Sequence, residues 1–242
     1  METKQLGTTE QDLALAGELL RQGQLVAFPT ETVYGLGADA LNETAVAQIY
    51  AAKGRPSDNP MIVHIAELSA LPELVTAIPE NAKILAEAFW PGPLTMVLPR
   101  SSKIPLTTTG GLETVAIRMP SHPVARAVIR AAGVPLAAPS ANRSGSPSPT
   151  TFRHCVDDLW GLVDAIVESD DCTVGVESTV LCFLPDGTPQ VLRPGAVTPE
   201  EIQRRCGCVS VAEAVLHMLP QDAAAPSPGM KYKHYAPAAT LT

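Results

Sequence analysis

Short apolar runs alternate with longer amphipathic segments along most of the chain, a pattern that predicts strands alternating with helices. Thr9 and Asn42 are the expected caps of the first two helices, and Gly23 is the expected residue just beyond the first. Runs of aliphatic and β-branched residues predict strands over 25–28, 61–65, 94–98, 114–119, 134–138, 165–168, 179–184 and 190–192. Apolar stripes and capping residues predict helices over 10–22, 43–53, 67–75, 80–90, 123–132, 151–162, 199–205 and 211–218.

A tight turn at Asp186-Gly187 joins two of the predicted strands into a hairpin. A hairpin pairs its strands antiparallel, whereas strand–helix–strand units pair them parallel. The sheet is therefore expected to be mixed. The predicted fold class is α/β, with a mixed β-sheet flanked by helices.

Polar residues cluster in the segment that follows the first predicted strand. That strand should end at Pro29, because proline cannot donate to a ladder. The predicted loop, Pro29–Gly37, holds hydroxyls, one carboxylate and two glycines at the carboxyl end of a strand, where α/β sheets bind ligands. A polar turn without function is the simpler interpretation. Gly35–Ala40 also matches the dinucleotide pattern G-x-G-x-x-A, but six residues separate the strand from its first glycine, which disfavours that interpretation.

Composition narrows the class of protein. The chain has 242 residues, enough for one large domain or two small ones, and a formal net charge of −8, which argues against a protein that mainly grips nucleic acid. We see no apolar run near the roughly 18 residues of a membrane span and no signal-peptide core, so we expect a cytoplasmic protein without a membrane partner. The five cysteines are odd in number and scattered, which predicts free, mostly buried thiols and no structural zinc.

The cations are concentrated at strand exits and loops. Lys53 and Arg55 stand where a helix passes to a strand, and Arg118 ends an apolar strand, where an arginine needs an anionic partner. An acidic chain with this distribution suggests a focused anion pocket, for a nucleotide phosphate or a small carboxylate. Seven of the 17 lysines and arginines lie in such stretches: Lys53, Arg55, Arg118, Arg143, Arg193, Lys231 and Lys233.

Several candidate site residues also have a simpler interpretation. Lys53 and Arg55 suit the end of a helix, where cations favour the helix dipole. His64 lies within a predicted strand and is by base rate a core histidine, although its place beside the 53–59 loop keeps a ligand role open. Ser178 directly precedes the predicted strand 179–184, and its simpler role is that of an ordinary strand cap.

Six stretches together resemble the YrdC-like threonylcarbamoyl-AMP synthase family. They are F-P-T-E-T-V-Y-G-L-G, K-G-R-P-S-D-N-P, W-P-G-P-L-T, A-I-R-M-P, A-A-P-S-A-N-x-S-G and L-R-P-G, spanning residues 28–195 in the family's order. The resemblance implies a twisted mixed sheet with a large concave active-site cleft. It also implies a nucleotidyltransferase that converts L-threonine, bicarbonate or CO2, and ATP into threonylcarbamoyl-AMP and pyrophosphate, for the N6-threonylcarbamoyladenosine (t6A) of tRNA.

The resemblance also assigns residues by matching position. Lys53 and Arg55 are expected to be catalytic by neutralising the triphosphate, both facing solvent without ligand. No resident metal is expected, because Mg²⁺ would travel on the ATP phosphates. The implied threonine contacts are Thr32, His64, Arg118, Ala138 (through its backbone) and Ser178. The implied ATP contacts are Lys53, Arg55, Asn59, Thr114, Ser140, Ser148, Arg193 and Tyr235.

The end of the chain changes character after Leu219. An Ala- and Pro-rich stretch, 221–227, precedes a stretch dense in lysines and rings, 228–237, which resembles the linker of the family's two-domain branch. We therefore expect a catalytic domain over 1–219 and a linker or lid over 220–242, with the second domain absent. Lys231–Tyr235 are expected to fold over the nucleotide; a frayed terminus is the simpler alternative.

The expected partners are L-threonine, ATP and the threonylcarbamoyl-transferase machinery that takes up the product, with tRNA contacted only indirectly. Two other classes stay open. One is an RNA-binding module, which the net charge of −8 and the 4% aromatic content disfavour. The other is a carbamoyl-handling relative that uses a different acceptor.

Overall fold

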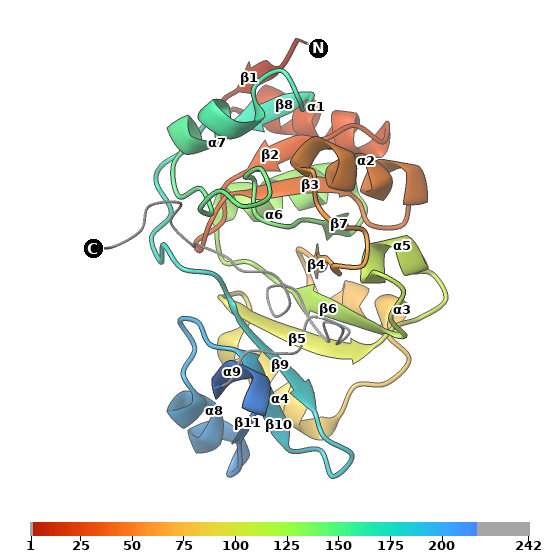
Figure 1. Ribbon diagram of the computed structural model, residues 1–242, viewed down its shortest axis with the longest axis vertical. Coiled ribbons are helices and arrows are strands. Elements are labelled where there is room, and N and C mark those ends of the chain that lie inside the picture. The colour runs from red at the N-terminus through yellow and green to blue at the C-terminus, as the bar shows by residue number, and fades with distance from the viewer. Residues whose placement is uncertain (1, 217–242) are drawn as a thin grey trace, which may run out of the picture.

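The structure is a computed structural model, and it describes residues 2–216. Its eleven strands form one mixed sheet, ordered β1-β8-β2-β3-β7-β4-β6-β5-β9-β10-β11 (Figure 1). The strands are β1 (Lys4–Leu6), β2 (Val26–Phe28), β3 (Gly35–Asp39), β4 (Ile62–His64), β5 (Leu94–Pro99), β6 (Thr114–Arg118), β7 (Leu136–Ala137), β8 (Ala165–Val167), β9 (Thr179–Phe183), β10 (Pro189–Arg193) and β11 (Ser210–Val211). The helices are α1 (Glu10–Arg21), α2 (Glu43–Lys53), α3 (Leu71–Leu74), α4 (Glu80–Phe89), α5 (Leu106–Thr109), α6 (Pro123–Ala132), α7 (Phe152–Leu159), α8 (Pro199–Cys206) and α9 (Glu213–Leu216), with a 3-10 turn, η1, over Leu68–Ala70.

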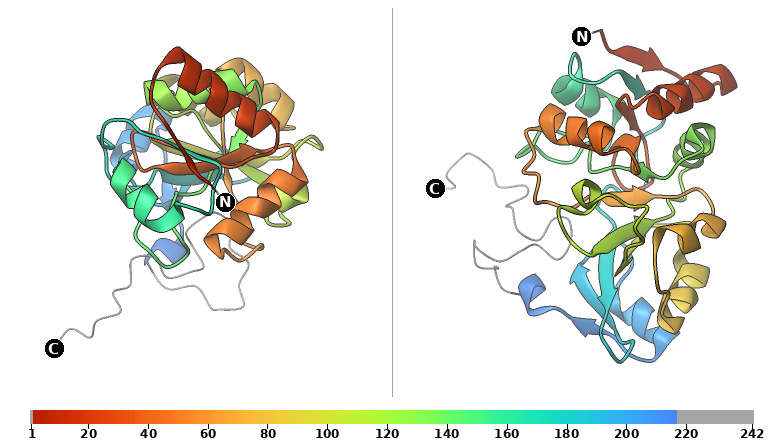
Figure 2. Two further views of the ribbon diagram at one scale, coloured as in Figure 1. Left: turned by 90° about the horizontal axis from the view of Figure 1, so that it is seen from above. Right: turned by 90° about the vertical axis from the view of Figure 1, so that its right-hand side faces the viewer.

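Helices cover both faces of the upper part of the sheet. Figure 2 shows α1 and α6 on one face, with α2 and α7 on the other. The alternation of side chains along β2 explains this arrangement, because Val26 and Phe28 join the core under α1 and α6, whereas Ala27 joins the core under α2. The predicted α/β class with a mixed sheet flanked by helices is confirmed.

Local signals set most element ends. The Thr9 hydroxyl accepts from the Asp12 N–H at the start of α1, and the Asn42 side chain caps α2. Helix α6 spans the predicted residues and ends at Gly133, a left-handed residue with φ of 69°. The hairpin expected at Asp186-Gly187 is present as the antiparallel pair β9 and β10. These elements confirm the capping and turn predictions.

The prediction of a loop from Pro29 to Gly37 is wrong over its last three residues. Gly35 begins β3, which pairs antiparallel with β2 and places Gly37 opposite Val26. A Cβ on Gly37 would lie 2.6 Å from the ring of Phe28, so the ring occupies the space that a side chain would need. Gly37 therefore allows the Phe28 ring to pack against the backbone of β3, although glycine by itself argues against a strand.

Other element boundaries also differ from the predictions. Strand β1 lies in an N-terminal stretch too polar and short to predict a strand, and β11 takes Val211 from a predicted helix, leaving Glu213–Leu216 as α9. Helix α7 ends at Leu159 rather than at 162. The two strand errors concern segments of two or three residues whose partners lie elsewhere in the sequence: β1 pairs with β8, and β11 pairs with β10.

All five cysteines are free thiols, as expected, but the expectation that most are buried is wrong. Only Cys155 is fully buried, and the other four are half-buried. Within residues 2–216 we find no helix with the length and apolar character needed to cross a membrane.

Candidate active site

One pocket forms where two of the predicted loops meet. Tyr34 donates its N–H to the Pro149 carbonyl at 2.8 Å and accepts from the Ala141 N–H at 2.8 Å, and Gly35 forms a β-bridge with Ser140. These backbone bonds hold the loop before β3 against the serine-rich loop after β7. The lining residues are Thr30, Thr32, Val33, Tyr34, Gly35, Arg55, Pro60, Met61, Ile62, His64, Arg118, Ala138, Pro139, Ser140, Glu177, Ser178 and Arg193.

The strand register brings three polar residues together at one end of this pocket. Arg118 lies opposite His64 of β4 on one side and opposite Thr95 of β5 on the other. Because β4 and β6 are parallel, both His64 and Arg118 stand at strand carboxyl ends. The Thr95 hydroxyl lies 2.8 Å from that of Ser178, which extends this polar row to the segment before β9.

Arg118 has the anionic partner that its buried position requires. Its side chain is 4% exposed, and its Nη2 lies 2.9 Å from Oε1 of Glu31, whose side chain is 6% exposed. Its Nη1 donates to the Thr32 hydroxyl at 2.9 Å, and its Nε donates to the Gly92 carbonyl at 3.4 Å. The expected need for an anion is thus confirmed, but the partner is a carboxylate of the protein itself.

His64 is a buried, neutral ring in this structure. Its Nδ1 lies 3.1 Å from the Ile62 carbonyl, which can only accept, so Nδ1 carries the proton. Burial, aided by the charge of Arg118, lowers the pKa of His64 to about 3. The side chain nevertheless lines the pocket, so its core position and a ligand role coexist.

A second ion pair forms the middle of the pocket. Nη1 of Arg193 lies 2.6 Å from Oε2 of Glu177, and Ser148 donates to the other carboxylate oxygen at 3.0 Å. The guanidinium also donates to the Ser178 carbonyl, at 3.1 Å from Nε and 2.9 Å from Nη2. A Cβ on Gly195 would clash with the Thr179 nitrogen and the Glu177 carbonyl. Glycine at this position therefore allows the chain after β10 to lie directly against the backbone of 177–179.

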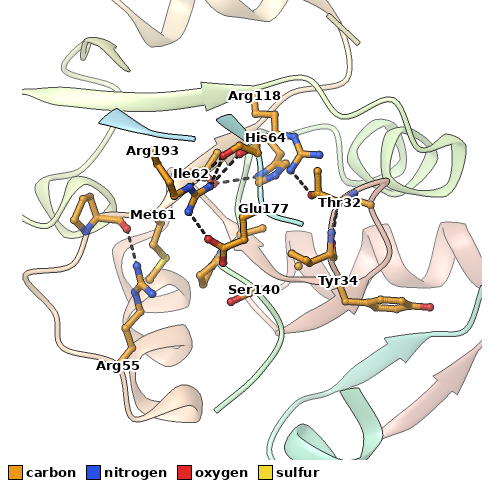
Figure 3. Close-up of a pocket in the computed structure, with 17 residues that line it drawn as sticks. Thr32, Tyr34, Arg55, Met61, Ile62, His64, Arg118, Ser140, Glu177 and Arg193 are labelled. Atoms are coloured by element: carbon orange, nitrogen blue, oxygen red, sulfur yellow. Dashed lines mark hydrogen bonds and ion pairs between the residues drawn. The ribbon is translucent and has the colours of Figure 1, made fainter. Parts of the chain in front are cut away.

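Arg55 stands apart from these residues (Figure 3). It follows the left-handed Gly54 that ends α2, is half-buried, and donates to the Asn59 carbonyl at 3.3 Å and the Pro60 carbonyl at 2.9 Å. In the view of Figure 3, Arg118 and Thr32 lie toward one end of the pocket, Arg55 toward the other, and Arg193 with Glu177 between them.

Lys53 is buried, and the expectation that it faces solvent is wrong. The residue is 3% exposed, and its ammonium donates to the carbonyls of Ser140 and Asn142. Its own carbonyl accepts from the Ser144 N–H at 2.9 Å. Burial, with a smaller contribution from Arg55, lowers the pKa of Lys53 to about 7. Lys53 therefore ties the serine-rich loop to the end of α2, beneath the pocket wall.

We expect Lys53→Met to lower the free energy of unfolding by about 2 kcal/mol, because two buried carbonyls lose their donor. Urea unfolding followed by circular dichroism measures this change, and Lys83→Met, at an exposed pair with Glu80, is the matched control. Unchanged stability would contradict the anchoring role.

The structure separates the predicted site residues into three groups. Thr32, Arg55, His64, Arg118, Ala138, Ser140, Ser178 and Arg193 line the pocket. Lys53, Asn59, Thr114 and Ser148 lie outside that lining; Asn59 is buried with its carbonyl bonded to Tyr50, and Thr114 begins the strand that Arg118 ends. Tyr235, together with the predicted linker 220–242 and the Lys231–Tyr235 lid, lies outside the described residues.

Two carboxylates of the site, Glu31 and Glu177, were missing from the predicted set. Each stands one residue before a predicted threonine contact, Thr32 or Ser178. Their proximity to the arginines is a tertiary feature: Glu31 is 87 positions from Arg118, and Glu177 is 16 from Arg193. The only local signals are that Glu31 lies inside the stretch F-P-T-E-T-V-Y-G-L-G and that Glu177 directly precedes Ser178.

The chain belongs to the Sua5/YciO/YrdC family. That family, which carries the description telomere recombination, matches residues 18–195, and the C-terminal domain described for threonylcarbamoyl-AMP synthase matches residues 197–242. Threonylcarbamoyl-AMP synthase of Bacillus subtilis is 52% identical over 240 residues, covering 99% of this chain and 68% of the relative. That of Pyrococcus abyssi is 50% identical over 232 residues, covering 96% and 67%. The chain thus spans about two thirds of the length of these relatives.

Solved structures agree with this assignment. P. abyssi Sua5 complexed with L-threonine superposes with a TM-score of 0.93 at 48% identity, covering 98% of this chain and 70% of that one. E. coli YciO, at 23% identity and a TM-score of 0.72, shares the fold. The predicted family, its two-domain branch and the enzyme class, a nucleotidyltransferase of the threonylcarbamoyl-AMP synthase type, are confirmed by these similarities.

Proposed function

We propose that this chain makes threonylcarbamoyl-AMP and pyrophosphate from L-threonine, bicarbonate or CO2, and ATP, and that the product is used for t6A formation in tRNA. The observation that carries the proposal is a single pocket with two kinds of anion site. A buried arginine flanked by Thr32 and His64 suits a small carboxylate, and Arg55 with Arg193 suits phosphates.

The proposed threonine contacts follow from what each group can still offer. Arg118 would bind the carboxylate and Ser178 the hydroxyl, with Thr32 beside the guanidinium. Ala138 donates its N–H to the Ile62 carbonyl at 2.9 Å, so its carbonyl is the group suited to the threonine ammonium. Neutral His64, protonated at Nδ1, would present Nε2 as an acceptor rather than a positive charge.

The proposed ATP contacts occupy the rest of the pocket and its rim. Arg55 and Arg193 would neutralise the triphosphate, and Lys53 would act as a positioning residue through the loop that carries Ser140. Asn59, Thr114, Ser148 and Tyr235 remain proposed contacts by motif position. Mg²⁺ would arrive bound to the phosphates of ATP. Glu177 is the sole carboxylate that lines the described pocket, so the protein would contribute only a minor part of the coordination of Mg²⁺.

The reaction needs no covalent intermediate on the protein. The neutral amine of threonine adds to CO2 and loses a proton to give a carbamate. A carbamate oxygen then bonds to the α-phosphorus of ATP, and the bond from that phosphorus to pyrophosphate breaks. Such a transfer depends on positioning and on neutralising charge, which arginines around one pocket supply.

The test is mass-spectrometric detection of threonylcarbamoyl-AMP after the protein is incubated with ATP, Mg²⁺, bicarbonate and L-threonine. We expect the adenylate only when all substrates are present, and more of it with threonine than with serine or valine. Equal yield with another amino acid would favour a carbamoyl-handling relative with a different acceptor. Absence of adenylate under conditions where ATP and threonine bind would refute the proposal.

A further inference from the structure

Glu31 stands behind the wall of the pocket, against Arg118. The two side chains form a buried ion pair, with 2.9 Å between Oε1 and Nη2. Arg118 and both neighbours of Glu31, Thr30 and Thr32, line the pocket, but Glu31 does not. A ligand in the pocket would thus meet the guanidinium and not the carboxylate that balances it.

The ion pair completes a set of contacts that fixes the guanidinium in three directions. Nη2 faces Glu31, Nη1 donates to the Thr32 hydroxyl, and Nε donates to the Gly92 carbonyl. Two of the five N–H groups of the guanidinium thus donate to Thr32 and Gly92, while Nη2 is buried beside the Glu31 carboxylate. The Arg118 guanidinium is held in place before any ligand binds, which reduces the entropy that the side chain loses when it binds a carboxylate.

Glu31 is itself held by the fold. Its carbonyl accepts from the Val174 N–H at 2.7 Å, and Thr30 closes the adjoining turn by accepting from the N–H groups of Thr32 and Val33 at 3.2 and 3.3 Å. Burial raises the pKa of Glu31, but the charge of Arg118 and hydrogen bonding by Arg118 and nearby backbone groups together outweigh this effect and keep the pKa below its ordinary value. The carboxylate is therefore charged at neutral pH.

Charge is balanced at this end of the pocket. Arg118 and Glu31 cancel, and His64, one of the neighbouring titratable groups, is neutral. An amino acid zwitterion is also neutral overall. Its binding therefore adds no net charge to this buried part of the pocket. A buried guanidinium without a counter-charge would instead attract any small anion.

We propose that Glu31 is a positioning and specificity-determining residue, which orients the Arg118 fork and cancels its charge so that this end of the pocket accepts a zwitterionic amino acid and rejects small free anions. The inference rests on the proposed function in taking L-threonine as that amino acid. It matters for the proposed reaction, because bicarbonate, ATP and pyrophosphate are all anions that would compete for an unbalanced Arg118.

The test replaces the carboxylate with an amide of the same shape, Glu31→Gln, and measures binding by calorimetry. We expect the Kd for threonine to rise at least about tenfold while that for ATP changes less than about twofold. We also expect inorganic phosphate to become a competitor of threonine, with an inhibition constant at least about tenfold lower than in the unmodified protein. Glu67→Gln, which removes the partner of Arg130 outside the pocket, should change none of these constants.

Glu31→Asp covers the case in which the amide variant does not fold. The shorter carboxylate keeps the charge but loosens the contact, so we expect a smaller rise in the threonine Kd and little competition by phosphate. Two results would overturn the inference: Glu31→Gln that binds threonine normally, or equal loss of threonine and ATP binding in Glu31→Asp.

Failure of the proposed function would look different. In that case the unmodified protein would not bind threonine at all. Direct phosphate titration would then still test the charge balance, because Glu31→Gln should gain a phosphate site that the unmodified protein lacks.

Discussion

Arg118→Lys is expected to raise the Kd for threonine about 100-fold, equivalent to about 2.8 kcal/mol, while the Kd for ATP changes less than about threefold. A lysine keeps the positive charge for Glu31, but a single ammonium cannot also replace the fork that reaches Thr32 and Gly92. The carboxylate of threonine would therefore meet a displaced point charge in place of an oriented guanidinium.

Isothermal titration with each substrate separates the two affinities. Arg130→Lys, on the outer face of α6 and paired with Glu67, is the matched control and should leave both unchanged. If Arg118→Lys weakens threonine and ATP equally, or neither, the assignment of Arg118 to the threonine carboxylate is wrong.

Arg55→Ala is expected to reduce the rate of threonylcarbamoyl-AMP formation about 1,000-fold, since an arginine that neutralises transferring phosphates contributes at least that much in comparable reactions. Stability should fall by only about 1 kcal/mol, because the lost hydrogen bonds reach two loop carbonyls from a half-buried side chain. Initial rates and urea unfolding of the same preparation measure both quantities.

The control for this variant is Arg126→Ala. Arg126 also donates from Nε and Nη2 to a backbone carbonyl, that of Ala66, at 3.3 and 3.1 Å, but lies outside the pocket lining. Its removal should cost similar stability and no activity. An Arg55→Ala protein that keeps near-normal rates, or that unfolds, would return Arg55 to the role of a helix-end cation.

Capping and turn signals in the sequence were reliable where structure is local. Thr9, Asn42 and Gly133 mark helix ends through contacts within a few residues. Strand β3 escaped prediction because Gly37 within it is explained only by the ring of Phe28 on the neighbouring strand. The reason for glycine in this strand is a residue on another strand, and the pattern of residues along the chain does not reveal such a contact.

The same division applies to the site. The need of Arg118 for an anion follows from its apolar neighbours in sequence, but the identity of the partner, Glu31, depends on how β6 and the loop after β2 are placed. Lys53 shows the opposite error. A lysine at a helix end usually faces water, and only the carbonyls of Ser140 and Asn142, brought from distant sequence, allow it to be buried.

The position of β8 in the sheet has a consequence for synthesis of the chain. Helix α1 connects β1 directly to β2, yet these strands do not pair with each other; β8 lies between them, with Lys4 and Val26 both opposite Ala165. While the ribosome has made only the first half of the chain, β1 has no strand to pair with. Contacts of such long sequence separation form slowly, since the intervening loop must first be closed. The amino-terminal edge of the sheet is therefore expected to close late in translation, when residues 165–167 insert between two strands already joined by a helix.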